Sequence, residues 1–221
     1  MHAPVPTLSP DRLREQLTRF AVQPLPTEGR RRAAVALVVV QEGMGADVPG
    51  LPKPTGWSQA PALLLTRRAA RLNSHAGQWA LPGGRMDEGE TAEDAARREL
   101  AEEVGLQLDD SAVLGRLDDY ATRSGYVITP VLMWGGEARQ LQANEAEVAS
   151  IHRIATQEFL RADAPLLQTV DGTDQPVLRM PVGDSWIAAP TAAFLYQFRE
   201  WLLCGRPTRV VHFDQPRFAW R

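Results

Sequence analysis

The chain has 221 residues, with 24 Lys and Arg against 27 Asp and Glu, so its formal net charge is −3. This length suits one domain with decorations, and an apolar share of 44% allows a sizeable buried core. The charge balance excludes the electrostatic footprint of a protein that binds duplex nucleic acid or an anionic membrane. Because Cys204 is the only cysteine, we expect no disulfide within the chain and no cysteine-based zinc site, which fits a reducing compartment.

No segment has the features of a targeting or membrane-spanning sequence. Residues 1–10 contain three prolines and no apolar stretch, unlike a signal peptide. The strongest apolar run, residues 33–40, is far too short to cross a bilayer. We therefore expect a cytoplasmic protein that binds neither a membrane nor a nucleic acid.

The first predicted helix covers residues 11–22, with Ser9 as its cap and Pro10 at its first position. The β-rich apolar run at 33–40 predicts a buried strand. Residues 41–61 are dense in Gly and Pro and predict a long loop. Loops of this length inside a compact domain are usually functional or disordered.

The middle of the chain predicts a strand at 62–66, a loop at 67–86 and a helix at 91–104. Thr91 suits the N-cap of this helix. Gly105 suits the position just after its last turn, where a left-handed backbone is common. The helix and the loop before it carry the residues on which a functional prediction depends.

The rest of the chain mixes further strands and helices. Strands are predicted at 113–120, 126–134, 148–154 and 185–188, helices at 157–161 and 190–203, and a basic, aromatic tail at 210–221. Because the order is not a regular alternation of strand and helix, we expect an α/β sandwich around a mixed sheet.

Three carboxylates gather on the predicted helix. Glu103 lies near the edge of its apolar stripe, Glu99 one turn earlier, and Glu102 beside them. Like charges at this spacing oppose helix formation by about 0.2–0.5 kcal/mol per pair, and partial burial adds to that cost or raises a pKa. A hard divalent cation removes the conflict. Oxygen ligands suit Mg²⁺, which also bridges substrate phosphates.

A solvated acidic helix is the competing interpretation, and the helix considered alone favours it. Its support is a set of i, i+4 ion pairs, Glu93–Arg97, Asp94–Arg98 and Arg98–Glu102. The loop before the helix favours a site instead. Residues 82–84, Pro-Gly-Gly, let the backbone approach a phosphate or cation closely, and Gly89 gives a turn. A glycine loop that leads into a helix beside carboxylates is typical of a diphosphate and metal site.

The spacing of these residues resembles a known family motif. Gly84, five residues, Glu90, seven residues and then the segment 98–106 resemble the complete Nudix box. The resemblance implies the Nudix fold, an α/β/α sandwich around a mixed β-sheet. It also implies hydrolysis of a nucleoside diphosphate linked to another group. The implied roles are metal binding by Glu99, Glu103 and the Gly83 carbonyl, a ligand or base at Glu102, orientation of the glutamates by Arg98, and structural positions at Glu90 and Gly105.

A second pattern lies just upstream of the box. Residues 64–69, Gly77 and residues 82–84 are similar to the signature of coenzyme A pyrophosphatases. This implies hydrolysis of coenzyme A or an acyl form to adenosine 3′,5′-bisphosphate and 4′-phosphopantetheine. Asn73 and Leu81 depart from the signature, which usually has Arg and Phe there. Since Asn cannot replace a phosphate-binding Arg, ADP-ribose, a dinucleotide or a nucleoside triphosphate stays as an alternative substrate.

Other single residues carry two interpretations each. Arg68 is a candidate phosphate ligand or a surface residue after a strand. His75 is a candidate phosphate contact or proton carrier, or it orders its loop by a hydrogen bond. Gly84 is a candidate substrate contact. Glu147 precedes a strand and is a candidate metal ligand or general base, or an exposed loop acid.

These observations together predict a Mg²⁺-dependent Nudix hydrolase, with Mn²⁺ as an alternative metal, that acts on a small nucleotide. A homodimer is compatible with the sequence. We expect an N-terminal helix and linker at 1–32, the Nudix domain at 33–205 and a tail at 206–221. A non-catalytic Nudix-fold nucleotide sensor is the alternative of another class. The sequence disfavours it, because such proteins typically lose glutamates of the box and this chain has them all.

Overall fold

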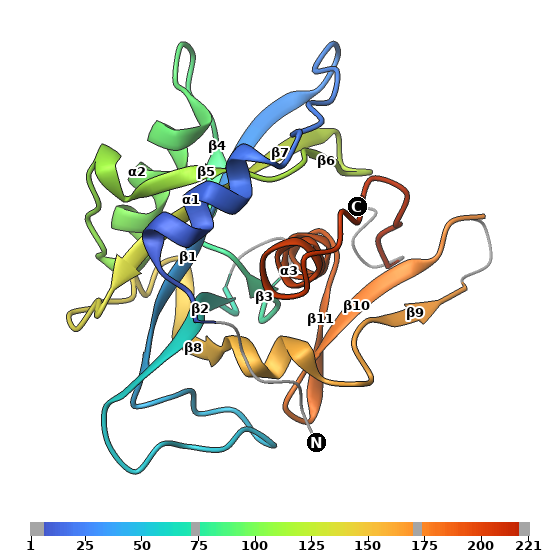
Figure 1. The fold of residues 1–221 in the computed structure, drawn as a ribbon. Coiled ribbons are helices and arrows are strands. Elements are labelled where there is room, and N and C mark those ends of the chain that lie inside the picture. The colour runs from blue at the N-terminus through green and yellow to red at the C-terminus, as the bar shows by residue number, and fades with distance from the viewer. Residues whose placement is uncertain (1–6, 72–75, 170–173, 217–221) are drawn as a thin grey trace.

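The computed structural model describes residues 7–71, 76–169 and 174–216 (Figure 1). The elements in chain order are α1 (Pro10–Thr18), β1 (Arg31–Gly43), β2 (Ser58–Arg68), β3 (Trp79–Ala80), β4 (Gly83–Arg85), α2 (Ala92–Val104), η1 (Asp110–Ala112), β5 (Val113–Arg116), β6 (Tyr120–Ala121), β7 (Tyr126–Gly136), β8 (Val148–Ala155), η2 (Thr156–Leu160), β9 (Leu166–Gln168), β10 (Val177–Val182), β11 (Ser185–Ala188), α3 (Thr191–Phe198) and η3 (Arg199–Leu203).

A large mixed sheet forms the centre of the molecule. Within the described residues its strands follow the order β3-β2-β1-β7-β5, with β4 also on β1, β6 on β7 and β8 on β2. The β1–β7 pair is parallel, whereas β1 pairs with β2 and β4 antiparallel. β1 is buried on both faces through most of its length, as expected of an apolar run at the centre of a sheet.

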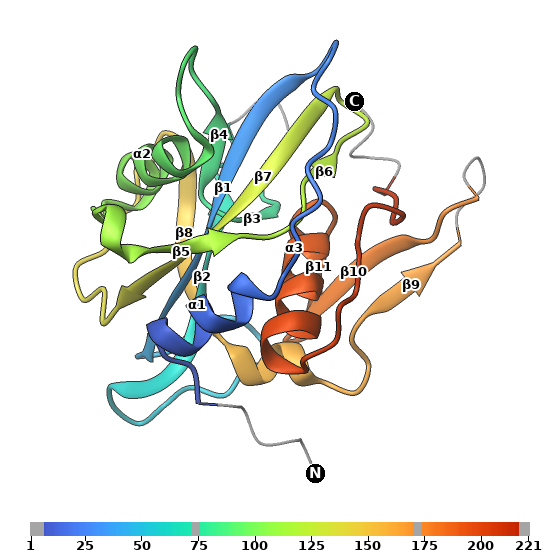
Figure 2. The ribbon, with the colours of Figure 1, turned by 45° about the horizontal axis from the view of Figure 1, so that its top comes forward.

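Two apolar layers cover the faces of this sheet, because side chains alternate along a strand. Ala34, Ala36 and Val38 of β1 pack in one cluster with Leu100 of α2. Leu37 lies in the other cluster, which also contains residues of α1 and α3. Figures 1 and 2 accordingly show α2 on one side of the sheet and α3 on the other. The predicted α/β/α sandwich around a mixed sheet is confirmed.

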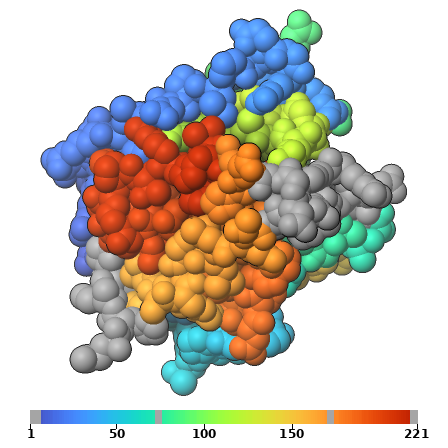
Figure 3. Space-filling model, turned by 90° about the vertical axis from the view of Figure 1, so that its right-hand side faces the viewer, coloured from blue at the N-terminus to red at the C-terminus, as the bar shows by residue number. Residues whose placement is uncertain are grey.

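A second, smaller sheet has the order β11-β10-β9 in the described part of the chain, with antiparallel pairs. The sequence predicted β11 but missed β9 and β10. The space-filling view in Figure 3 shows the smaller sheet in orange, and beside it, in red, the segment that follows α3, next to the N-terminal segment in blue. α1 and η3 are in direct contact, because Gln16 Nε2 donates to the carbonyl of Leu202 at 3.3 Å.

Several predicted boundaries were wrong. α1 ends at Thr18, four residues before the predicted end. The loop predicted at 67–86 contains β3 and β4, and both ends of the loop predicted at 41–61 extend β1 and β2. The strand predicted at 113–120 divides into β5 and β6, because buried Asp118 and Asp119 leave the ladder and accept hydrogen bonds from the backbone N–H groups of Gln23 and Leu25.

α2 has the predicted caps. The Thr91 side chain accepts from the backbone N–H of Asp94 at 3.1 Å, and Gly105 adopts a left-handed φ of 70° and donates to the carbonyl of Ala101. Of the ion pairs predicted along the helix, the contact of Arg98 with Glu102 forms, at 3.4 Å.

The other two predicted pairs were wrong. Glu93 binds Arg116 of β5, and Asp94 binds Arg97 one residue closer than predicted. Tertiary contact with the sheet therefore replaces a local pair for Glu93. In the described residues, none of the helices combines the length and the apolar character needed to cross a bilayer.

Replacing Gly105 with Ala tests the helix end. A Cβ there would meet Gln142 at 3.4 Å, an ordinary contact, so the cost comes from the left-handed backbone. We expect G105A to lower the free energy of unfolding by roughly 1 kcal/mol in urea titrations. G56A is the matched control: Gly56 has open space around a Cβ and no left-handed φ, so its stability should be unchanged or raised. Equal losses in the two variants would contradict this account.

Candidate functional site

Two carboxylates of α2 are withdrawn from water. Glu103 is 5% exposed, and the side chain of Glu99 is 14% exposed. Burial raises the pKa of Glu103 to about 8, helped by the charges of Glu99 and Glu147 and opposed by Arg68. Burial likewise raises the pKa of Glu99, against the effect of its contact with Arg98. Both groups favour the protonated form more than a glutamate in water does.

The glycine loop lies directly against these carboxylates. A Cβ added at Gly84 would collide with the carboxylate of Glu99, and a Cβ at Gly83 would collide with Ala34 and Val35 of β1. A backbone hydrogen bond from Gly83 opposes the rise in the pKa of Glu103. Glycine is therefore required at position 83, where a Cβ would meet the backbone of β1, whereas a side chain at position 84 would force the Glu99 carboxylate to move.

Arg98 connects the loop to the helix. Its Nε and Nη2 donate to both oxygens of Glu90, at 2.9 and 3.0 Å, and Nη2 also donates to the carbonyl of Arg85 at 3.0 Å. Nη1 donates to Glu99 at 2.8 Å. Glu90 in turn accepts from the backbone N–H of Asp87 at 2.9 Å. This network ties the loop before α2 to the helix.

Glu90 and Glu103 have opposite electrostatic environments. The Arg98 guanidinium lowers the pKa of Glu90, whereas burial raises that of Glu103. Glu102 differs from both in its exposure. Its side chain is 56% exposed and contacts Arg98 Nη1 at 3.4 Å. The helix and its loop thus hold one carboxylate paired with Arg98 (Glu90), one that is buried (Glu103) and one that is exposed to solvent (Glu102).

Two further predicted residues lie close to Glu103. Arg68, at the end of β2, lowers the pKa of Glu103, whereas Glu147, before β8, raises it. The backbone joins the two segments, since the N–H of Ala69 donates to the carbonyl of Glu147 at 2.8 Å. The Arg68 Nε is buried without a hydrogen-bond partner among the described residues. The Arg68 guanidinium beside the acidic cluster therefore has an N–H group that a ligand could accept from.

A cavity of about 670 Å³ opens beside the glycine loop. Its wall includes Gly83, Gly84 and Arg68 together with residues of β1, β7 and the start of α3. Its volume falls within the roughly 300–1,000 Å³ usual for small-molecule sites. The sequence missed three lining residues: Arg31 lies 4.0 Å over the ring of Tyr126, and Arg85 Nε donates to the Tyr126 hydroxyl at 2.6 Å. Their proximity depends on the β1–β7 pairing, which no local pattern reveals.

Some predicted positions fall elsewhere. His75 and Asn73 lie outside the described residues. Leu81 is buried and lines the cavity. The described part of the tail packs on the body, where the Tyr120 hydroxyl donates to the carbonyl of Phe213 at 2.9 Å.

The donor set fits a hard cation that retains water. Among the described residues, no group of three or more His, Cys, Asp or Glu side chains could enclose a metal ion. Mg²⁺ does not need such a cage, because it usually keeps several waters and binds through one or two carboxylates and the phosphates of its substrate. The mutually repelling carboxylates of half-buried Glu99 and buried Glu103 match that requirement.

Comparison with known proteins agrees with this geometry. The model of the NUDIX domain matches residues 30–173. The Nudix hydrolase NudL of Photorhabdus laumondii is 36% identical over 154 residues, which cover 67% of this chain and 74% of the relative. Nudix hydrolase 3 of Caenorhabditis elegans is 34% identical over 104 residues, 45% of this chain and 43% of the relative. The matched segment thus spans less than half of one relative and about three quarters of the other.

A solved structure supports the fold independently. The MutT/nudix family protein of Enterococcus faecalis superposes with a TM-score of 0.54 at 19% identity, over 85% of this chain and 68% of that protein. At this identity the likeness concerns the fold alone. The matched domain, the relatives and the shared architecture show that this chain belongs to the Nudix hydrolase family.

Proposed function

We propose that the protein is a Mg²⁺-dependent diphosphatase that cleaves coenzyme A or an acyl form of it, with Mn²⁺ as an alternative metal. The observation that carries the reaction type is the convergence of Glu99, Glu103, Glu147 and Arg68 beside the glycine loop. The cavity next to that loop accommodates a nucleotide-sized ligand. The substrate choice rests on the resemblance of residues 64–84 to the coenzyme A signature.

The residues have distinct roles in this proposal. Glu99 and Glu103 hold the metal, with Glu102 and the Gly83 carbonyl completing its environment. When bound, the metal neutralises the diphosphate and lowers the pKa of water. Glu102 or Glu147 accepts the proton of the attacking water. Both are exposed in the described structure, so proton exchange with solvent is open to them.

The cavity suits an anionic substrate. Arg31, Arg68 and Arg85 line it, and no ion pair joins any of them to a carboxylate of the described residues within 4.0 Å. Gly83 and Gly84 let a diphosphate approach the backbone closely. These features hold for any nucleoside diphosphate derivative. ADP-ribose, a dinucleotide and a nucleoside triphosphate are therefore the rival outcomes of a substrate test.

A cytoplasmic location, a homodimer and the division of the chain at residues 32 and 205 stay predictions. The role of His75 stays one as well.

A substrate panel tests the proposed reaction. Coenzyme A, acetyl-coenzyme A, ADP-ribose, a dinucleoside polyphosphate and a nucleoside triphosphate are incubated with Mg²⁺, and the products are resolved by mass. We expect the highest kcat/KM for a coenzyme A compound, with adenosine 3′,5′-bisphosphate as a product. Preference for another compound would overturn the substrate but keep the reaction type. Nucleotide binding without any turnover would favour a non-catalytic sensor.

The E103Q variant tests the metal assignment. Loss of a buried anionic ligand is expected to lower kcat/KM by at least about 100-fold and to weaken Mg²⁺ uptake measured by calorimetry. The fold should persist, because Gln has nearly the same shape. Full activity in E103Q would contradict the assignment.

Glu147 and Glu145 form a matched pair of exposed loop acids, two residues apart. The negative charge of Glu147 raises the pKa values of Glu99 and Glu103. If Glu147 is the base, E147Q lowers kcat by about 10²–10⁴-fold and removes the acid limb of the pH–rate profile. E145Q is expected to behave as the wild type. If E147Q and E145Q gave the same kcat, Glu102 would take the role of base.

The raised pKa of Glu103 predicts a pH effect on stability. Since its folded-state pKa is about 8 and that of an unfolded glutamate is about 4.3, the folded state holds an extra proton between these values. The stability of the metal-free protein should therefore fall as pH rises from about 5 to 8. E103Q should flatten this part of the profile, and Mg²⁺ should restore the melting temperature at pH 8. A decline of the same slope in E103Q would assign the effect to other groups.

A further inference from the structure

A smaller cavity of about 240 Å³ adjoins the one described above. The two cavities share the residues Gln78, Trp79, Ala189, Pro190 and Thr191. The smaller volume is below the roughly 300–1,000 Å³ of whole-ligand sites, so it suits one part of a ligand whose remainder occupies the larger cavity.

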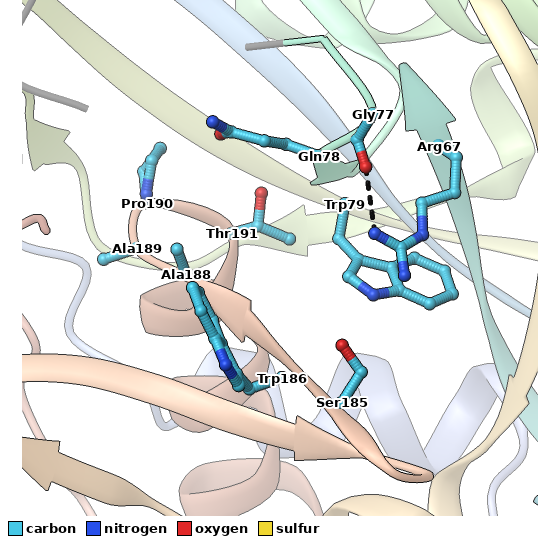
Figure 4. A pocket seen from close by; sticks show the side chains of 10 residues that line it. All are labelled: Arg67, Gly77, Gln78, Trp79, Ser185, Trp186, Ala188, Ala189, Pro190 and Thr191. Atoms are coloured by element: carbon cyan, nitrogen blue, oxygen red, sulfur yellow. Dashed lines mark hydrogen bonds between the residues drawn. The ribbon is translucent and has the colours of Figure 1, made fainter. Parts of the chain in front are cut away.

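Arg67 supplies a positive charge to this cavity. Its guanidinium lies 4.0 Å from the ring centre of Trp79, and its Nη1 donates to the carbonyl of Gly77 at 2.9 Å (Figure 4). No Asp or Glu is among the lining residues, and no carboxylate of the described chain lies within ion-pair distance of Arg67. Burial lowers the pKa of Arg67, as expected for a partly desolvated cation without an opposite charge.

Two further groups favour an anion at the same place. α3 begins at Thr191 in the cavity wall, and no side chain caps its N-terminus. The first turn of a helix carries a partial positive charge and attracts anions. The Nε1 of Trp79 is buried without a hydrogen-bond partner among the described residues, and the side chain is 6% exposed. In Figure 4 this nitrogen lies on the side of the ring toward Ser185.

Arg67 and Arg68 serve different surroundings. Arg68 influences Glu103 and lines the larger cavity, whereas Arg67 contacts Trp79 and lines the smaller one. Both cavities lie on the α3 side of the sheet, since they share Trp79 and Ala189 of the cluster that includes α3, and Arg67 lines only the smaller one. The cation of the smaller cavity is then separate from the groups that surround the cleaved diphosphate.

We propose that the smaller cavity is a second phosphate subsite, in which Arg67 binds a phosphomonoester that the substrate carries away from its diphosphate. This inference rests on the proposed function and narrows its substrate class to nucleotides with an additional phosphate. In coenzyme A that group is the 3′-phosphate of the ribose. An apolar acyl or pantetheine chain would leave the Arg67 charge unpaired, so the cavity suits it less well.

Coenzyme A and its 3′-dephospho form provide the test, since they differ only in this phosphate. We expect the wild type to have a higher kcat/KM for coenzyme A. R67L should lower the ratio of the two kcat/KM values by about 10- to 100-fold, the range for a hydrogen bond between charged groups. R67K should retain part of the ratio, because it keeps the charge but loses the planar fork. The change should appear in KM more than in kcat.

R139L is the matched control. Arg139 lies over Trp57 at 4.2 Å, the same kind of stacking, but it lines neither cavity. The ratio in R139L should equal that of the wild type. Melting curves of each variant identify any loss of folding. A wild-type ratio near one, or an R67L ratio equal to the wild type, would overturn the subsite.

Calorimetry separates this inference from the proposed reaction. Adenosine 3′,5′-bisphosphate and adenosine 5′-monophosphate are titrated into the protein without turnover. Tighter binding of the bisphosphate that R67L abolishes would support the subsite even if coenzyme A were not hydrolysed. Equal affinities for the two mononucleotides would overturn it even if coenzyme A were a good substrate.

Discussion

Burial of the Glu103 carboxylate against the central sheet is the constraint on which the site depends. The side chain is 5% exposed, and an ionised group in such a place is costly unless a charge or hydrogen bonds compensate it. The nearby cation, Arg68, only partly opposes the rise of its pKa to about 8. A divalent cation would compensate the negative charge that Arg68 leaves uncompensated. The glycine loop shares this constraint, because any side chain at Gly84 would displace Glu99.

Different surroundings give the glutamates of this site different pKa values. A bidentate contact with Arg98 lowers the pKa of Glu90 and ties the loop to α2. Glu103 has no such partner and favours a proton. Environments that push the pKa values of similar groups apart commonly mark different roles at one site. Arg98 contacts Glu90, Glu99 and the carbonyl of Arg85, and so holds the loop beside the acidic face of α2.

Local features were predictable from the sequence, and contacts across the fold were not. The caps of α2 at Thr91 and Gly105 follow from residues a few positions apart, and both formed. β4 was missed because three residues with two glycines carry no strand signal; it exists because β1 offers it an edge. Glu93 likewise left its predicted partner for Arg116, which only the tertiary fold brings near. The motif indicated the acidic cluster, whereas the cavity wall with Arg31 and Tyr126 required the structure.

The alternation of β2 explains how one short segment serves two surroundings. Leu63 and Leu65 pack in the cluster that includes α3, and Leu64 packs in the cluster that includes α2. The contacts of the two arginines follow this alternation: Arg67 stacks on Trp79 of the first cluster, and Arg68 lowers the pKa of Glu103 on α2. A one-residue shift in the register of β2 would move Arg67 to the face covered by α2 and Arg68 to the face covered by α3. In the proposed site, the register of β2 on β1 therefore matters for substrate binding as well as for packing, because it fixes the position of each cation relative to Glu103.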